Sequence, residues 1–129
     1  MDDAQRQAQS VVCTVPNLPY AKVGPNSRHH HYQRNRLSQA AKEGMLAMLY
    51  QQGCQQSPLW ERAHLDITFR AADRRRRDLD NLIGACKPWL DALVGVVIVD
   101  DSADRLSLMA RYERGDTEQT VLVISSLVE

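Results

Sequence analysis

Aspartate and arginine residues meet at one point of the chain, in an order that suits phosphate chemistry. Asp78 and Asp80 follow directly after four consecutive arginines, Arg74, Arg75, Arg76 and Arg77. Guanidinium groups bind phosphate oxygens two at a time and remain charged, whereas carboxylates bind divalent cations. This order predicts a loop that binds a phosphodiester backbone and brings it to a metal site. The alternative is a solubilising loop in which Arg75 or Arg77 pairs with a neighbouring carboxylate.

Two pairs of aspartates offer oxygen ligands for that metal. Asp78 and Asp80 are two residues apart, so an extended backbone would direct both carboxylates to one side. Like charges held close together are costly unless a cation lies between them, and Mg²⁺ binds a few carboxylates while keeping several waters. The Asp100-Asp101 pair follows a short apolar strand and can supply a third ligand. In the alternative interpretation Asp80 caps a helix that starts at Asn81, Asp78 is solvated, and the later pair forms a polar turn.

Lys87 is the one lysine close to this segment, about two turns into the helix that follows Asp80. From there its ammonium can stabilise the negative charge that develops on a phosphoryl group in the transition state. The alternative is a surface lysine paired with Asp91 at i,i+4.

A second basic element lies at residues 26–36, where we expect Arg28, Arg34 and Arg36 to contact phosphates. Tyr32 or a histidine of the His29-His30-His31 run would stack on a base. Metal binding by that run is disfavoured, because adjacent side chains do not face one another and no carboxylate lies nearby in the sequence.

These residues must be positioned by a small α/β unit. Apolar periodicity and turn residues predict strands at 11–15 and 63–69, helices at 37–52 and 81–93, and a hairpin of strands 105–114 and 119–128 around Gly115-Asp116. Pro88 should kink or break the second helix, because proline lacks the N–H that a helix interior requires. The order β-α-β-α-β-β predicts helices packed on a mixed sheet, in a single domain that spans residues 1–129.

The overall composition fits this picture. The net charge is zero, yet residues 21–77 hold 11 basic and 4 acidic residues, whereas residues 78–129 hold 4 basic and 10 acidic ones. A basic half can bind a polyanion while clustered carboxylates bind cations; the alternative is two solvated surface patches. Residues 1–9 should be frayed, and we expect neither a secretory signal nor a membrane span. Three cysteines without metal-site spacing are typical of reduced thiols in a cytoplasmic protein.

The segment DRRRRDLDN, followed by a lysine, an L-D-A-L segment and an aspartate pair, resembles the RusA family of Holliday junction resolvases, which phages and prophages often carry. The segment GPNSRH at 24–29 is similar to a P-x-N-x-R loop of the same family. The resemblance implies a homodimer that binds four-way DNA junctions and makes paired nicks with Mg²⁺, or with Mn²⁺ in its place. It assigns catalysis and metal binding to Asp78, Asp80 and Asp101, and an essential lysine to Lys87.

Five residues separate the D-L-D-N motif from Lys87, whereas some members of the family have two, which moves a helical lysine by almost one turn. The expected chemistry is hydrolysis of a phosphodiester by water activated at one or two metal ions. Two alternatives stay open at this point. One is the same chemistry directed at flaps or forks, and the other is a catalytically silent protein that binds branched DNA.

Overall fold

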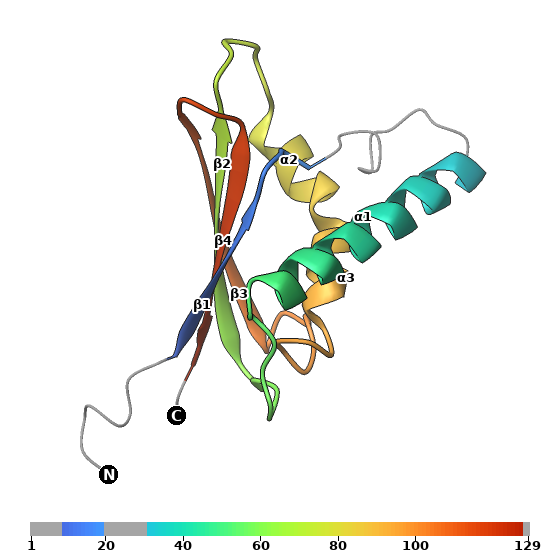
Figure 1. Cartoon of the computed structure of the whole chain (residues 1–129), viewed down its shortest axis with the longest axis vertical. Coiled ribbons are helices and arrows are strands. Elements are labelled where there is room, and N and C mark those ends of the chain that lie inside the picture. The colour runs from blue at the N-terminus through green and yellow to red at the C-terminus, as the bar shows by residue number, and fades with distance from the viewer. Residues whose placement is uncertain (1–8, 20–30, 128–129) are drawn as a thin grey trace.

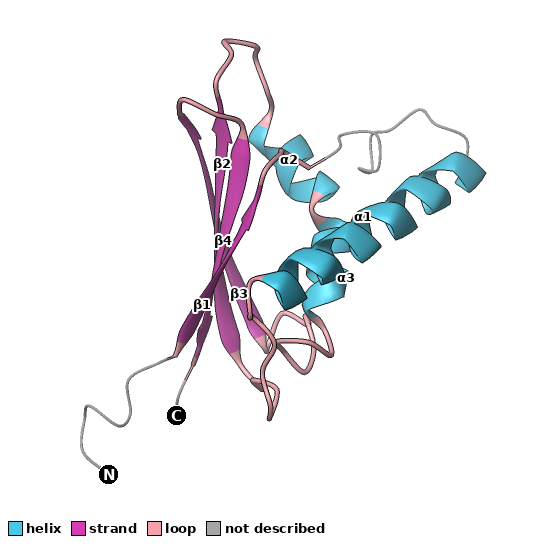
Figure 2. Ribbon diagram, in the orientation of Figure 1, coloured by secondary structure: helices cyan, strands magenta, loops and turns pink. Residues whose placement is uncertain are grey.

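The computed structural model describes residues 9–19 and 31–127, and in them a four-stranded mixed sheet carries three helices (Figure 1). In chain order the elements are β1 (Ser10–Val15), α1 (His31–Gln51), β2 (Ala63–Ala71), α2 (Leu79–Ala85), α3 (Lys87–Leu93), β3 (Leu106–Arg114) and β4 (Gln119–Ser126). All three helices lie on one side of the sheet (Figure 2). The predicted α/β class with a mixed sheet is therefore confirmed.

The core lies between the sheet and the helices, and β2 runs through its centre. Leu65, Ile67 and Phe69 are fully buried, as the predicted alternation of this strand requires, while the residues between them are half-buried. Leu122 and Ile124 of β4 lie beside them on the same face. Each such side chain contributes roughly 1.5–3 kcal/mol on burial, so this face fixes the register of the sheet and the position of the loop that leaves its end.

The predicted hairpin of the last two strands is wrong. The sheet order is β1-β4-β2-β3, so β2 lies between β3 and β4. Phe69 of β2 pairs with Tyr112 of parallel β3 on one side and with Thr120 of antiparallel β4 on the other. The Gly115 region reverses the chain as expected, but it crosses the end of β2, where the Gly115 N–H donates to the Ala71 carbonyl at 3.2 Å. β2 has more fully buried apolar side chains than any other strand of the described sheet, and its interior position covers both of its edges.

The second helix breaks where Pro88 predicted a kink or a break. The first part ends at Ala85, and Pro88 lies in the first turn of α3, where its missing N–H costs nothing. The Cys86 N–H bonds to the Ile83 carbonyl at 3.0 Å, which tightens the chain at the junction. The broken helix also starts two residues earlier than expected, at Leu79, and α1 starts at His31 rather than at residue 37.

No strand forms at 96–99, contrary to expectation. Ile98 makes only isolated bridges, to Trp60 and Val94, and the N–H groups of Val97 and Ile98 both return to the Leu93 carbonyl. Val96, Val97 and Ile98 are buried in a tight turn after α3, whereas Val99 is exposed, so the apolarity of this segment reflects burial in a turn and not a strand. Asp100 and Asp101 follow that turn.

The three cysteines are buried and free. Among the helices of the described ranges, none combines the length and apolarity needed to cross a membrane.

Candidate nucleic-acid interface and carboxylate site

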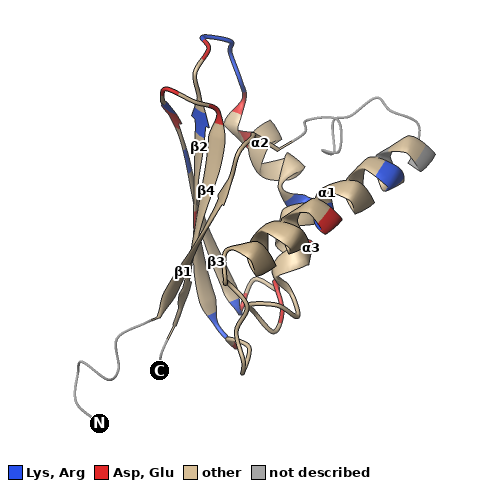
Figure 3. Cartoon of the chain, in the orientation of Figure 1, with Lys and Arg blue, Asp and Glu red and all other residues tan. Residues whose placement is uncertain are grey.

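The arginine run forms the exposed loop between β2 and α2, at the end of the sheet where β2 finishes (Figure 3). Arg77 is held inside this loop: its guanidinium donates to both oxygens of Asp73, at 2.6 and 3.0 Å, and its side chain is 12% exposed. The Arg75 backbone N–H donates to the same carboxylate at 3.1 Å. The Arg77 hydrogen bonds hold the pKa of the Asp73 carboxyl well below its usual range. Arg77 thus behaves as the alternative interpretation of the arginine run expected.

The other arginines of the run remain accessible. The side chains of Arg75 and Arg76 are 78% and 91% exposed, and Arg74 is also exposed. Arg75 Nε lies 3.4 Å from Asp73, a loose pair for so exposed a side chain. Exposed guanidinium groups that keep most of their donors open are suited to binding phosphate.

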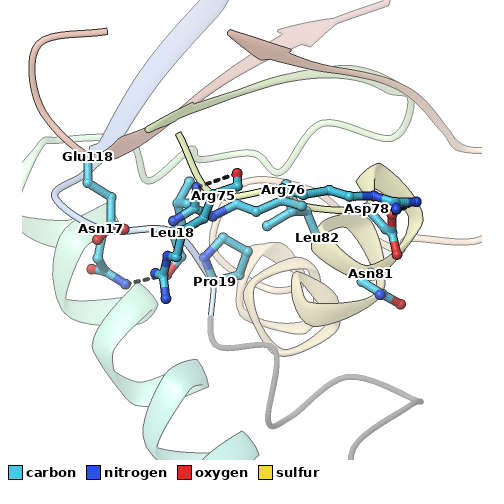
Figure 4. Close-up of a pocket in the computed structure, with 10 residues that line it drawn as sticks. Asn17, Leu18, Pro19, Arg75, Arg76, Asp78, Asn81, Leu82 and Glu118 are labelled. Carbon is cyan, nitrogen blue, oxygen red and sulfur yellow. Dashed lines mark hydrogen bonds and ion pairs between the residues drawn. The ribbon is translucent and has the colours of Figure 1, made fainter. Parts of the chain in front are cut away.

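A cleft of about 810 Å³ lies beside this loop (Figure 4). Its walls come from four places in the chain: the end of β1, the arginine loop, the start of α2 and the β3–β4 turn. The lining residues are Asn17, Leu18, Pro19, Arg75, Arg76, Arg77, Asp78, Asn81, Leu82 and Glu118. Figure 4 shows Arg76 extending toward Asp78, and its Nη2 lies 3.6 Å from the Asp78 Oδ1. The cleft therefore joins exposed cationic groups to one of the expected metal ligands.

The sequence predicts one extended segment for Asp78 and Asp80, but the structure does not form it. Asp78 is the residue before α2 and has extended backbone angles (φ −88°, ψ 128°), but its side chain makes no capping hydrogen bond. Asp80 already lies in the first turn of the helix, and its Oδ1 accepts the Asn81 backbone N–H at 3.0 Å. The helix begins early because an acidic residue in the first turn is favourable at a helix N-terminus. Both carboxylates are exposed.

Lys87 and Asp101 meet at the start of α3. Lys87 Nζ lies 2.8 Å from Asp91 Oδ1 and 3.6 Å from Asp101 Oδ2. The hydrogen bond to Asp91 raises the pKa of the Lys87 ammonium, and Asp101 adds to this effect. The lysine thus makes the i,i+4 pair of the alternative interpretation and also contacts an expected catalytic carboxylate.

The expected metal ligands are the right chemical type, but they do not form one closed group. Within residues 9–19 and 31–127, no three His, Cys, Asp or Glu side chains are gathered closely enough to hold a metal ion. Asp78 and Asp80 lie at the start of α2, whereas Asp101 lies against Lys87. Mg²⁺ commonly binds through one or two carboxylates together with substrate phosphates. The residues therefore fit a cation held jointly with a phosphate ligand better than a cation held by the protein alone.

The structure describes only part of the second basic element, residues 26–36. Arg28, with His29 and His30, lies outside the described residues. Arg34 and Arg36 lie in the first turns of α1, and the Arg36 side chain is exposed.

Sequence reasoning missed the residues that close the cleft from the other side, namely Asn17, Leu18, Pro19 and Glu118. The Thr120 hydroxyl fixes this side by donating to the Asn17 carbonyl at 2.9 Å. The residues belong to no motif, and they reach the arginine loop because β4 pairs with β1 on one side and with β2 on the other.

The resemblance to a known family rests on sequence motifs alone. No protein-family model matches the chain, and the curated proteins include no sequence match to it.

Proposed function

We propose that this protein is a metal-dependent, structure-selective endonuclease that cuts four-way DNA junctions by paired nicking. The observation that carries the proposal is the cleft in which Arg75 and Arg76 stand beside Asp78. A polyanion drawn to the exposed guanidinium groups would lie against a carboxylate that can share a cation with it. The choice of a four-way junction, and of a homodimer with two symmetric sites, rests on the resemblance of the DRRRRDLDN segment to RusA resolvases.

Each group has a distinct task in the proposed reaction. Arg75 and Arg76 bind phosphates on either side of the scissile bond and orient the strand. Asp78 and Asp80 would hold Mg²⁺, with Asp101 as the expected third carboxylate. When bound, Mg²⁺ supplies an activated water and neutralises the phosphate. Lys87 lies against Asp101 and stabilises the charge that develops on the phosphoryl oxygens.

A second candidate is a protein that binds branched DNA without cutting it. It is favoured by the charge pairing already present at the site. Arg76 lies 3.6 Å from Asp78, and Lys87 contacts both Asp91 and Asp101, so these carboxylates have cationic partners within the protein. In a binding protein such pairs would hold the loop and α3 in place.

One incubation separates the two candidates. A labelled four-way junction and a linear duplex of the same sequence are each incubated with the protein in Mg²⁺, in Mn²⁺ or in EDTA. An endonuclease gives paired nicks in the junction that require the metal and are absent from the duplex. Gel-shift binding of the junction without any product under all three conditions would favour the silent protein. Cleavage of flaps or forks in preference to junctions would keep the chemistry and change the substrate.

A further inference from the structure

Asp73, the residue before the arginine run, is the most heavily bonded carboxylate of the loop. It receives the two Arg77 bonds at 2.6 and 3.0 Å and the Arg75 backbone N–H at 3.1 Å. Arg114 of β3 donates to the Asp73 carbonyl at 3.3 Å. Asp73, at the start of the arginine loop, therefore contacts Arg75 in its middle and Arg77 at its end, and its carbonyl bonds the loop to β3 of the sheet.

These contacts divide the three arginines that line the cleft, Arg75, Arg76 and Arg77, into two kinds. Arg77 faces inward and also lies 3.5 Å from the Tyr112 hydroxyl of β3, so the end of the loop is fastened to the sheet. Arg75 and Arg76 line the cleft with exposed side chains. Four adjacent positive charges repel one another. Arg77, whose side chain is 12% exposed and paired with Asp73, is a single anchor that favours one loop shape over the others.

We propose that Asp73 is a positioning residue for phosphate recognition. By holding Arg77 and the Arg75 backbone, it keeps the loop in the form that directs Arg75 and Arg76 into the cleft, where they bind neighbouring phosphates of a DNA backbone. The nature of that ligand rests on the proposed function. Arg77 then acts through the loop shape, and not as a phosphate contact.

The sign of one substitution separates this proposal from simple electrostatics. Asp73→Asn removes a negative charge beside four arginines, so long-range electrostatics alone predicts tighter binding of any polyanion. The positioning role predicts weaker binding, because Arg75 and Arg76 are no longer held in place. Glu118→Gln is the matched control: it removes the same charge from the opposite wall of the cleft and should tighten binding. Asp116→Asn, in the exposed β3–β4 turn, controls for net charge alone.

Two probes are used, a short DNA duplex and inorganic tripolyphosphate, each measured by calorimetry at several salt concentrations. For Asp73→Asn we expect about tenfold weaker binding of both, the loss of roughly one charge-assisted contact. The log–log salt slope for the duplex should fall by about one, even though every arginine is still present. Faster amide exchange at Arg75, with an unchanged melting temperature, would show that the loop has loosened while the fold is intact.

Arg77→Lys gives a second, charge-conserving test. Lysine keeps the positive charge but cannot make the two-pronged contact with Asp73. We expect it to weaken binding to a similar degree, and the double variant Asp73→Asn/Arg77→Lys to be no worse than either single variant, because both break the same contact. Unchanged binding by Arg77→Lys would mean that only the charge matters.

The outcomes keep the two proposals apart. Weaker tripolyphosphate binding by Asp73→Asn supports the positioning role even if the wild-type protein cuts no junction, in which case the proposed function alone fails. Binding by Asp73→Asn that equals or exceeds that of the wild type, as for Glu118→Gln, overturns the positioning role whether or not junctions are cut. Wild-type protein that binds neither probe overturns it as well.

Discussion

Lys87 Nζ lies 3.6 Å from the Asp101 carboxylate, although the two residues belong to α3 and to the loop that follows it. The break of the helix at Cys86 places Lys87 at the beginning of α3, and the tight turn after Leu93 brings the chain back toward it. The contact joins two residues whose predicted roles rest on the family resemblance, the essential lysine and the second aspartate of the Asp100-Asp101 pair. Lys87 therefore has a second carboxylate neighbour, Asp101, besides its i,i+4 partner Asp91.

Replacement of Lys87 by alanine tests that relationship. If Lys87 stabilises the transition state, Lys87→Ala should slow single-turnover cleavage of a four-way junction by roughly a hundredfold to a thousandfold, with little change in junction affinity. Lys87→Arg should rescue poorly, because a planar fork does not replace a compact point charge. Asp91→Asn is the control, since it removes the other partner of Lys87 and should leave the rate within a few-fold of wild type. An exposed pair is worth less than ~1 kcal/mol, so a near-normal rate for Lys87→Ala would reduce the lysine to that pair.

Asp80→Asn tests the metal site. The amide keeps the size of the side chain and removes the charge that a divalent cation needs, so cleavage should be abolished. Junction binding in EDTA should be intact or tighter, because a negative charge near the phosphates has gone. The measurements are product formation in Mg²⁺ and a gel shift in EDTA. Asp104→Asn, which replaces an exposed carboxylate outside the cleft, should cut normally. Wild-type rates for Asp80→Asn would remove α2 from the metal site.

Combined replacement of Arg75 and Arg76 by alanine tests the cleft. Both side chains line it, and their loss should weaken binding to all DNA and lower the log–log salt slope by up to about one unit for each lost phosphate contact. Arg105→Ala/Arg111→Ala removes the same charge elsewhere: Arg105 precedes β3 at the other end of the sheet, and Arg111 is paired with Asp66 at 3.0 Å. A slope that falls equally in both double variants would show that net charge, and not the cleft, sets the affinity.

The three cysteines give a test of the fold that is independent of DNA. Burial raises the pKa of the Cys13 and Cys86 thiols to about 12, and Cys54 is also buried with a raised pKa. Only the thiolate reacts, so at pH 8 the native protein should react with an aromatic disulfide reagent at least about a hundredfold more slowly than in urea. Absorbance of the released thiolate measures both rates. Rapid reaction of all three thiols in the native protein would contradict the burial of these cysteines in the core.

Local patterns were sufficient for much of this molecule. The alternation in 63–69 predicted a half-buried strand because the side chains of a strand point to opposite faces, and the structure buries Leu65, Ile67 and Phe69. Pro88 predicted the break in the second helix for an equally local reason, its missing N–H. The arginines and carboxylates of the segment 73–80 could be identified as candidate site residues from their types alone, without knowledge of the fold.

Which of these elements meet depends on the three-dimensional packing. Periodicity cannot say that β2 lies between β3 and β4, because a turn at Gly115 is compatible with either pairing and the choice depends on which strand buries most apolar surface. Nor could the sequence show that Arg77 faces inward onto Asp73 while Arg75 and Arg76 face outward. Asn17 and Glu118 reach the cleft through the pairing of β1 with β4, a contact between the two ends of the chain. Residue types and their spacing were enough to predict the chemistry that the side chains offer. The packing of the sheet decided which of them share a site, because non-local pairing carries no local signature.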